Sequence, residues 1–243
     1  MTDHARRLRD LHRPGDPLLL PNVWDAGSAR AVQEAGFPAL ATASAAISAM
    51  LGYPDHQVAP AEEMFAAAGR VIRVADVPVT VDAEAGYGLE PAELVDRLLA
   101  IGAAGCNLED TYADGLARPE TQAAYLAAVR AAAGDALVIN ARADSFIAKA
   151  ADPVADATAR GRLYLEAGAD CVYTIGAPLD AVPALVEGIP GPVNANQFPG
   201  TSLADLAAAG VARVSYGPRP YHQALAALKE FAGRVLAKED PYR

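Results

Sequence analysis

The chain has 243 residues, of which 52% are hydrophobic and 21% are charged, and its formal net charge is −10. This length is typical of an eight-unit α/β barrel that buries one large core, so we expect a single domain over residues 1–243. A strongly negative protein repels phosphate backbones and anionic lipids, so we expect no nucleic-acid partner and no membrane partner.

The first twenty residues carry charges throughout, and His4 and His12 lie in this polar N-terminal segment. The segment has no apolar stretch of the length that a signal peptide requires. No later run approaches the length of a membrane span. We therefore expect a cytoplasmic protein.

Eight short apolar runs alternate with longer segments whose apolar residues recur every three or four positions. This alternation is typical of repeated strand–helix units and predicts an α/β fold, a (β/α)8 TIM barrel. Cys106 and Cys171 fall in the fourth and sixth strands, too far apart for a disulfide, so we expect buried thiols. The predicted strands span residues 18–23, 39–43, 79–82, 105–109, 137–142, 171–174, 193–196 and 211–215.

Helices are predicted between these strands, because several segments begin with proline and end at glycine. A last helix, over residues 221–237, carries a long apolar face formed by Leu225, Leu228, Phe231 and Val235. This face must pack on something. The other predicted helices include residues 60–74, 91–101, 119–132, 153–167 and 203–209.

Acidic residues gather where three neighbouring strands end. Asp55 lies in the loop after the second strand, Asp82 and Glu84 follow the third, and Glu109 ends the fourth. These loops build the active site of a (β/α)8 barrel. Clustered carboxylates raise one another's pKa unless a cation joins them, so Mg2+ or Mn2+ is the natural partner. Each acid alone could instead cap a helix or pair with arginine, but their joint placement favours a metal site.

Other polar groups lie at the same end of the predicted barrel. Arg142 ends the fifth strand, where it can bind a carboxylate bidentately or neutralise Glu109 or Asp144, and both roles are compatible. The small segment 43–46 could present backbone N–H groups to an anion. Asn196, at the end of the seventh strand, could donate to a substrate or close a turn. None of the four histidines has metal-ligand spacing.

Three blocks of sequence resemble the isocitrate lyase / phosphoenolpyruvate mutase superfamily, in its short single-domain branch. They are SAMLGYPD at 48–55, PVTVDAEAGYG at 78–88 and GCNLED at 105–110. The resemblance implies chemistry at the third carbon of a pyruvate-like unit, through an enolate whose charge the metal stabilises. It also implies a homotetramer whose C-terminal helix packs on a neighbouring subunit, as in a swapped arrangement.

The same resemblance implies roles for individual residues. Asp82 would contact Mg2+ directly, whereas Asp55, Glu84 and Glu109 would reach it largely through water. Amides near Ser44 and Ala45 would bind the carboxylate of the 2-oxo acid, and Arg142 would contact the bound intermediate. Asn196 matches an asparagine that the lyases carry. The predicted substrate-binding residues are therefore Ser44, Ala45, Asp82, Arg142 and Asn196.

The loop after the fourth strand departs from the lyase pattern. The lyases carry a Lys-x-Cys-Gly-His loop whose cysteine acts as general acid, but residues 110–119 read DTYADGLARP. The mutase branch also uses a lysine-bearing loop, and the lyase glutamate at the end of the sixth strand is absent. We expect Tyr112 or a water to replace the missing acid, with Arg142, Glu109 and Tyr112 as candidate catalytic residues.

These observations lead to three hypotheses. The first is a Mg2+-dependent carbon–carbon lyase of the isocitrate or methylisocitrate lyase type, acting on a 2-oxo acid or related dicarboxylate. The second is an oxaloacetate decarboxylase or a phosphoenolpyruvate hydrolase or mutase. The third is a 2-oxo-acid-binding protein with little turnover.

Overall fold

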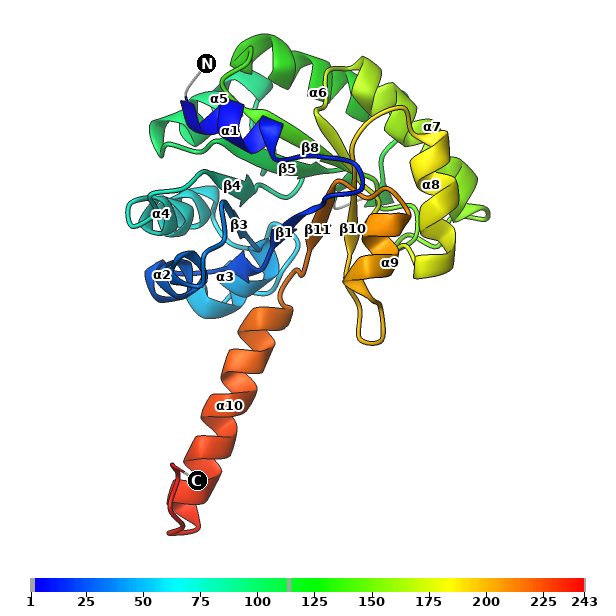
Figure 1. Cartoon of the computed structure of the whole chain (residues 1–243). Coiled ribbons are helices and arrows are strands. Elements are labelled where there is room, and N and C mark those ends of the chain that lie inside the picture. The colour runs from blue at the N-terminus through cyan, green and yellow to red at the C-terminus, as the bar shows by residue number, and fades with distance from the viewer. Residues whose placement is uncertain (1–2, 113–114, 243) are drawn as a thin grey trace.

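Parallel strands form a closed barrel whose first strand is interrupted at Pro21. The computed structural model, which describes residues 3–112 and 115–242, arranges nine strands in one sheet (Figure 1). The first strand of the barrel is divided: β1 pairs with β11, and β2 pairs with β3. Pro21 separates the two halves and has no N–H for the ladder. The strands are β1 (Leu18–Leu20), β2 (Asn22–Val23), β3 (Leu40–Thr42), β4 (Val79–Asp82), β5 (Gly105–Glu109), β8 (Val138–Arg142), β9 (Cys171–Tyr173), β10 (Val193–Asn196) and β11 (Arg213–Ser215).

The predicted (β/α)8 fold is confirmed. Three strands, β4, β5 and β10, have the predicted bounds, and the other strands begin or end within two residues of them, apart from the division at Pro21. The strand assignments were reliable because each strand is a short apolar run between polar turn residues. Cys106 and Cys171 are buried free thiols, as expected.

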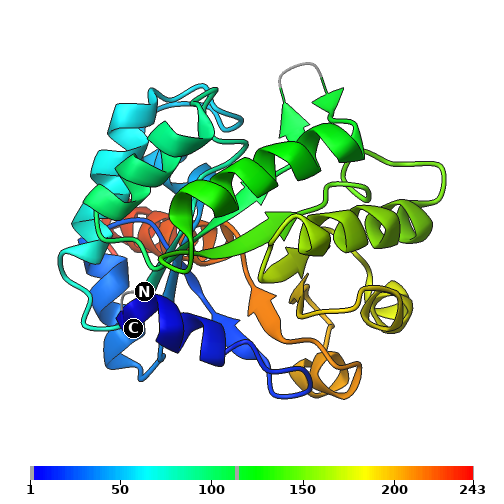
Figure 2. The same ribbon diagram turned by 90° about the horizontal axis from the view of Figure 1, so that it is seen from above.

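Helices form a ring outside the strands (Figures 1 and 2). Several begin with proline in the first turn, where its missing N–H costs no helical hydrogen bond. None of the helices in the described ranges is long and apolar enough to cross a membrane. The helices are α1 (Asp3–Asp10), α2 (Ala26–Glu34), α3 (Ser44–Leu51), α4 (Ala61–Ile72), α5 (Pro91–Ala100), α6 (Pro119–Ala133), α7 (Pro153–Glu166), a 3-10 turn (Leu179–Ala181), α8 (Val182–Gly188), α9 (Leu203–Ala208) and α10 (Arg219–Leu236).

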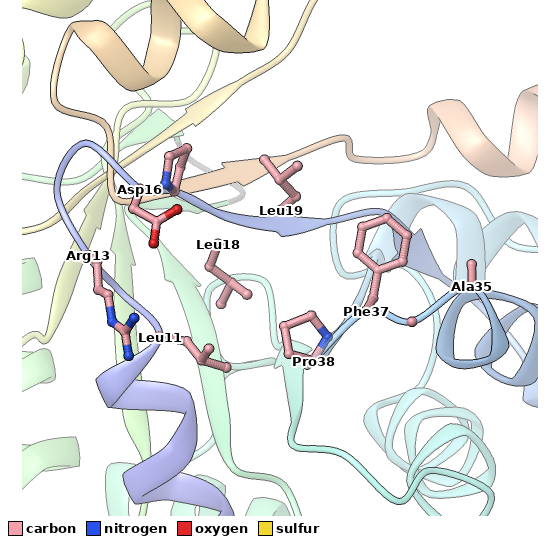
Figure 3. Close-up of a pocket in the computed structure, with 10 residues that line it drawn as sticks. Leu11, Arg13, Asp16, Leu18, Leu19, Ala35, Phe37 and Pro38 are labelled. Atoms are coloured by element: carbon pink, nitrogen blue, oxygen red, sulfur yellow. The ribbon is translucent and has the colours of Figure 1, made fainter.

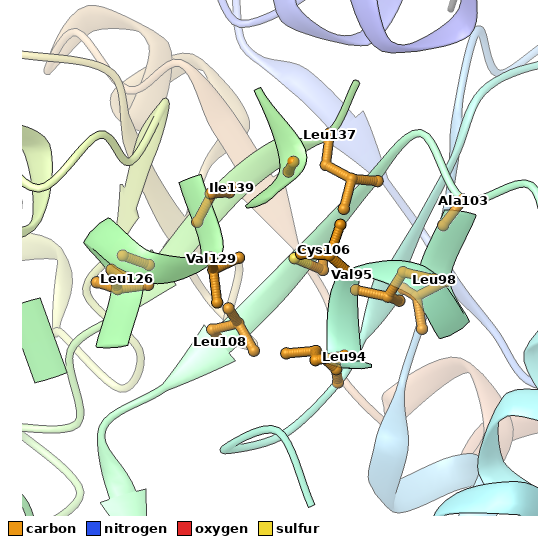
Figure 4. Packing of buried hydrophobic residues seen from close by; sticks show 14 of the residues in the cluster. Leu94, Val95, Leu98, Ala103, Cys106, Leu108, Leu126, Val129, Leu137 and Ile139 are labelled. Carbon is orange, nitrogen blue, oxygen red and sulfur yellow. The ribbon is translucent and has the colours of Figure 1, made fainter. Parts of the chain in front are cut away.

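The largest apolar cluster lies between the strands and the helices α5 and α6. Figure 4 shows Leu94 and Leu98 of α5 and Val129 of α6 around Cys106 and Leu108 of β5, and all five side chains are buried. Burial of one such leucine side chain stabilises the fold by about 1.5–3 kcal/mol. This packing holds β4 and β5, and therefore their polar ends, in fixed positions.

The polar N-terminal segment forms a helix against the barrel. In α1, Leu8 is fully buried and packs with Leu18 and Leu20 of β1. Arg9 donates to the Leu137 carbonyl and pairs with Asp170, which lie just before β8 and β9. The helix therefore lies at the end of the barrel where the strands begin, opposite the predicted active site.

Two further elements extend from the barrel. Helix α10 projects away from it (Figure 1), and none of its residues is buried. A small antiparallel hairpin, formed by β6 (Thr111–Tyr112) and β7 (Gly115–Leu116), follows β5. This hairpin occupies the place of the loop that departs from the lyase pattern.

Candidate active site at the carboxyl ends of the strands

A cavity of about 220 Å³ lies where the barrel strands end. Its lining comes from strand ends and the loops that follow them, which is the expected location of an active site in this fold. The predicted residues Ser44, Ala45, Asp55, Asp82 and Arg142 all line it. The structure therefore brings one group of predicted site residues together in a single cavity.

A second hollow, of about 380 Å³, lies at the opposite end of the barrel (Figure 3). Its lining includes Leu11, Leu18, Phe37 and Pro38, with Arg13 and Asp16 as its charged members. No set of acids converges there. The smaller cavity at the carboxyl ends of the strands is therefore the better candidate for chemistry.

Asp82 ends β4 and is anchored by the first residue of α3. Its Oδ2 atom accepts hydrogen bonds from the Ser44 backbone N–H at 2.9 Å and from the Ser44 hydroxyl at 2.8 Å. Within the described ranges, no residue donates to Oδ1. The Ser44 amide is thus engaged by Asp82, whereas Ala45 is the other predicted amide that lines the cavity.

Glu84 is buried beside Asp82 in a tight loop. Its backbone φ is +49°, and its Oε2 atom accepts a 2.5 Å hydrogen bond from the Gln57 backbone N–H. Burial raises the pKa of Glu84 to about 7, with further contributions from Asp82 and Asp55. Its Oε1 atom is buried without a hydrogen-bond partner in the part of the chain described. An unpartnered carboxylate oxygen beside other acids fits a site that gains a cation.

Glu109 and Asp144 hold Arg142 between them. Arg142 Nη1 lies 2.5 Å from Glu109 Oε2, and its Nε and Nη2 atoms donate to the two oxygens of Asp144 at 2.6 and 2.9 Å. Burial raises the pKa of Glu109 to about 8, although Arg142 opposes this increase and Asp82 adds to it. The Arg142 guanidinium therefore neutralises Glu109 and Asp144, which is one of the two roles expected for it. It also lines the cavity, where the other role, binding a substrate carboxylate, is open to it.

The acids have the chemistry of a hard-cation site without forming a closed cage. Among residues 3–112 and 115–242, no group of three or more His, Cys, Asp or Glu side chains is close enough to hold an ion by itself. Asp82 nevertheless influences the pKa of both Glu84 and Glu109. The residues therefore fit an ion with one direct carboxylate ligand and bound waters that reach the other acids.

Four predicted residues lie outside this cavity lining: Glu84, Glu109, Tyr112 and Asn196. Tyr112 lines a neighbouring hollow with Glu109, and its hydroxyl donates to Gln122 Oε1 at 2.8 Å. Asn196 Nδ2 donates to Tyr173 Oη at 2.6 Å, and its Oδ1 accepts from the Gly176 N–H. Asn196 therefore braces Tyr173, which does line the cavity.

The cavity also contains residues that the sequence analysis did not select. Asn107, Asp144 and Tyr173 line it, and so does His56, which had been set aside for lack of metal-ligand spacing. Asn107 could have been found from strand alternation, because it precedes Glu109 by two positions and so shares its face. The sequence pattern does not indicate His56. Its position at the site depends on a loop in which His56 and Gln57 both have positive φ.

Comparison with known proteins gives consistent similarities. The phosphoenolpyruvate phosphomutase family matches residues 8–236. The crystal structure of a candidate phosphonomutase from Burkholderia cenocepacia J2315 superposes with a TM-score of 0.90 at 41% identity, covering 98% of this chain and 100% of that one. The oxaloacetate decarboxylase of Paraburkholderia xenovorans is 32% identical over 212 residues, which cover 78% of this chain and 70% of the relative. The 2-methylisocitrate lyase of Bacillus subtilis is 31% identical over 180 residues, covering 70% and 58% respectively.

Proposed function

This chain belongs to the phosphoenolpyruvate phosphomutase family, within the superfamily that includes isocitrate lyase, and on that basis we propose that it is a Mg2+-dependent carbon–carbon lyase. The proposed substrate is a 2-oxo acid or related dicarboxylate, cleaved as in isocitrate and methylisocitrate lyases. The observation that carries the proposal is a cavity whose lining brings together Asp55, Asp82 and Arg142.

We assign direct contact with the cation to Asp82, because Ser44 occupies only its Oδ2 atom. Asp55, Glu84 and Glu109 would reach the ion through water. When bound, Mg2+ would supply positive charge beside the oxo-acid oxygens, where negative charge develops as the bond breaks. Burial raises the pKa of Glu84 and of Glu109, and a nearby cation would stabilise their ionised forms.

The remaining groups bind and orient the substrate. Arg142 is held rigidly by Glu109 and Asp144, so its guanidinium needs little ordering when a carboxylate binds. The Ala45 amide lies in the first turn of α3, where backbone N–H groups attract anions. For Asn196 we retain a supporting role in substrate binding, through its hydrogen bond to Tyr173.

Tyr112 is our candidate for the acid that replaces the missing cysteine. Burial raises the pKa of Tyr112, with Asp110 and Glu109 adding to the effect, so the hydroxyl keeps its proton at neutral pH. We expect Tyr112→Phe to reduce product formation at least tenfold, as loss of a general acid does, while Mg2+-dependent oxalate binding is retained. Equal turnover in Tyr112→Phe and wild type would contradict the role of Tyr112 and would indicate that a water molecule is the general acid.

Oxaloacetate decarboxylation is the second candidate, favoured by the sequence that follows β5. Residues 111–116 include neither cysteine nor lysine, and the chain resembles an oxaloacetate decarboxylase over 212 residues. Decarboxylation of oxaloacetate releases CO2 and leaves an enolate that takes a proton to give pyruvate. That reaction needs the same cavity but tolerates a different covering loop.

The test is product formation with purified protein, Mg2+ and four substrates: isocitrate, 2-methylisocitrate, oxaloacetate and phosphoenolpyruvate. Cleavage of isocitrate to glyoxylate and succinate, or of 2-methylisocitrate to pyruvate and succinate, is expected for the lyase. Pyruvate from oxaloacetate alone would favour the decarboxylase. Mg2+-dependent oxalate binding without any product would instead identify a 2-oxo-acid-binding protein. Chelation with EDTA should abolish each activity.

A further inference from the structure

A buried arginine lies beneath the candidate active site. Arg213 on β11 is fully buried inside the barrel. Its Nη2 atom donates to Asn107 Oδ1 at 3.1 Å, and its Nε atom contacts Ser215 Oγ at 3.4 Å. Because three strands separate β11 from β5 in the sheet order, the guanidinium crosses the barrel interior to reach Asn107.

Arg213 has no acidic partner. Across residues 3–112 and 115–242, no carboxylate lies within ion-pair distance of its guanidinium, and its Nη1 atom is buried without an acceptor. Burial lowers the pKa of Arg213. A buried charge paired only with neutral oxygens is costly, so Arg213 is a candidate for a role beyond packing.

The contacts of Asn107 determine which way its carboxamide points. Its Oδ1 atom accepts from Arg213 and also from Asn140 Nδ2, at 2.8 Å. An amide oxygen has two lone pairs, and both are used. The reversed orientation would place an NH2 group against the guanidinium, which can only donate. The arginine therefore fixes the amide with its oxygen toward the barrel interior.

The NH2 group of Asn107 consequently faces away from Arg213. Asn107 lines the cavity, and its strand neighbour in the β4–β5 register is Asp82. In the part of the chain described, no residue accepts a hydrogen bond from Asn107 Nδ2. The floor of the cavity thus presents a neutral donor, with a positive charge behind it, beside the carboxylate that we assign to the cation.

We propose that Asn107 is a ligand-binding residue whose Nδ2 atom donates to an oxygen of the bound oxo acid, and that Arg213 is the positioning residue that orients it. This inference rests on the proposed function, because it takes the ligand to be an anionic oxo acid. The donor carries no titratable proton, and its orientation is set from a strand on the far side of the barrel.

Oxalate and Mg2+ are the probes for this proposal, measured separately by calorimetry on the full chain. Asn107→Leu should weaken Mg2+-dependent oxalate binding about 10- to 100-fold, the effect of losing one hydrogen bond to a charged acceptor. Its affinity for Mg2+ alone should stay within about threefold of wild type, because a lost hydrogen bond to oxalate removes no cation ligand. Unchanged oxalate affinity, or an equal loss of Mg2+ affinity, would overturn the assignment.

Asn194→Leu is the matched control. Asn194 is a fully buried asparagine of the barrel interior, it donates to Ser215 Oγ at 3.2 Å, and it is not part of the cavity lining. This variant should keep wild-type oxalate affinity. If Asn107→Leu does not fold, Asn107→Asp serves instead, since it gives Arg213 a carboxylate partner but replaces the donor with an acceptor. It should also lose oxalate binding while Mg2+ binding is kept or strengthened.

A double-mutant cycle tests the positioning role of Arg213. Arg213→Met removes a buried charge without an acidic partner, so we expect a folded protein with weaker oxalate binding. Combined with Asn107→Leu, it should cause no additional loss, because the arginine acts through the amide. Additive losses would overturn that role. Failure of wild type to bind oxalate with Mg2+ would refute the proposed function, whereas equal binding by wild type and the Asn107 variants would refute only this inference.

Discussion

At the residue scale, the carboxylate of Asp82 is the centre of the proposed site. We expect Asp82→Ala to abolish Mg2+-dependent oxalate binding, because the cation loses its direct protein ligand. The fold should remain, since Asp82 lies at the cavity and its partner Ser44 can be solvated there. Calorimetry measures the binding and circular dichroism the fold. Asp135→Ala, at an exposed position, is the control, and oxalate binding by both variants would contradict the assignment.

The buried side chain of His12 should make the free energy of unfolding depend on pH. Its ring is buried and its Nδ1 atom bonds the Leu8 carbonyl at 2.7 Å. Burial lowers the pKa of His12 to about 4, with Arg213 adding to the effect. Between the unfolded value of 6.5 and this folded value, the unfolded chain binds a proton that the folded chain does not. Stability contributed by neutral His12 is therefore present above pH 6.5 and is lost as the pH falls toward 4.

The variant His12→Asn never gains this charge, so its stability should fall less in acid. Between pH 7.5 and 4.5, the wild type should lose roughly 2–3 kcal/mol more of its free energy of unfolding than the variant, a value that follows from the pKa shift. Urea unfolding at several pH values measures this difference. His222→Asn, at an exposed site, is the control. Parallel pH profiles for wild type and His12→Asn would contradict the prediction.

At the scale of elements, the pairing of β5 with β8 requires a glycine at one position. A Cβ atom on Gly105 would lie 2.6 Å from the Val138 carbonyl oxygen and 3.0 Å from Leu8. Because the first contact is with backbone, the strands must separate. Gly105→Ala should therefore lower the free energy of unfolding by about 1–3 kcal/mol, as overpacking does.

Gly69→Ala is the control for this prediction. Its Cβ would lie 3.6 Å from Ile101, an ordinary contact, within the helix α4. Alanine in a helix interior is favoured over glycine by about 0.5–1 kcal/mol, so this variant should be neutral or more stable. Both changes are measured by urea denaturation. Equal stability of the two variants would show that β5 can move without cost.

At the scale of the whole molecule, helix α10 carries a largely exposed apolar face, on which Phe231 makes an edge-to-face contact with Tyr242. Its side chains Leu228 and Val235 are 61% and 52% exposed, and Leu225 and Phe231 are 44% and 38% exposed. Such a continuous exposed apolar face is typical of an interface. We propose that α10 packs on a second copy of the chain in a homo-oligomer, expected from the family resemblance to be a tetramer.

Charge on that face should disrupt the assembly. We expect Leu228→Glu to shift the protein toward smaller species at micromolar concentration, because a buried unpaired carboxylate is costly. Sedimentation velocity measures the change. Ala226→Glu places the same charge about 160° around the helix and should leave the assembly intact. A monomeric wild type, or an unchanged Leu228→Glu variant, would contradict the proposed interface.

The sequence alone was sufficient to predict the barrel and the acidic end of it. Strands β4 and β5 were predicted with their bounds because each is an apolar run that ends in acids. Parallel strand ends meet at one rim of a barrel, so Asp82 and Arg142 could be placed in one site without coordinates. Their assignment to a cation and an oxo acid stays a prediction.

Only the tertiary structure decided which polar groups already have partners. It shows that Ser44 donates a hydrogen bond to Asp82 and that Asn196 donates one to Tyr173. It also shows that Arg213 donates to Asn107, which is 106 positions away in the sequence. It also turns the polar N-terminal segment into a helix at the far end of the barrel. Local periodicity reports which face a side chain occupies, but a hydrogen bond between distant strands depends on how the whole barrel closes.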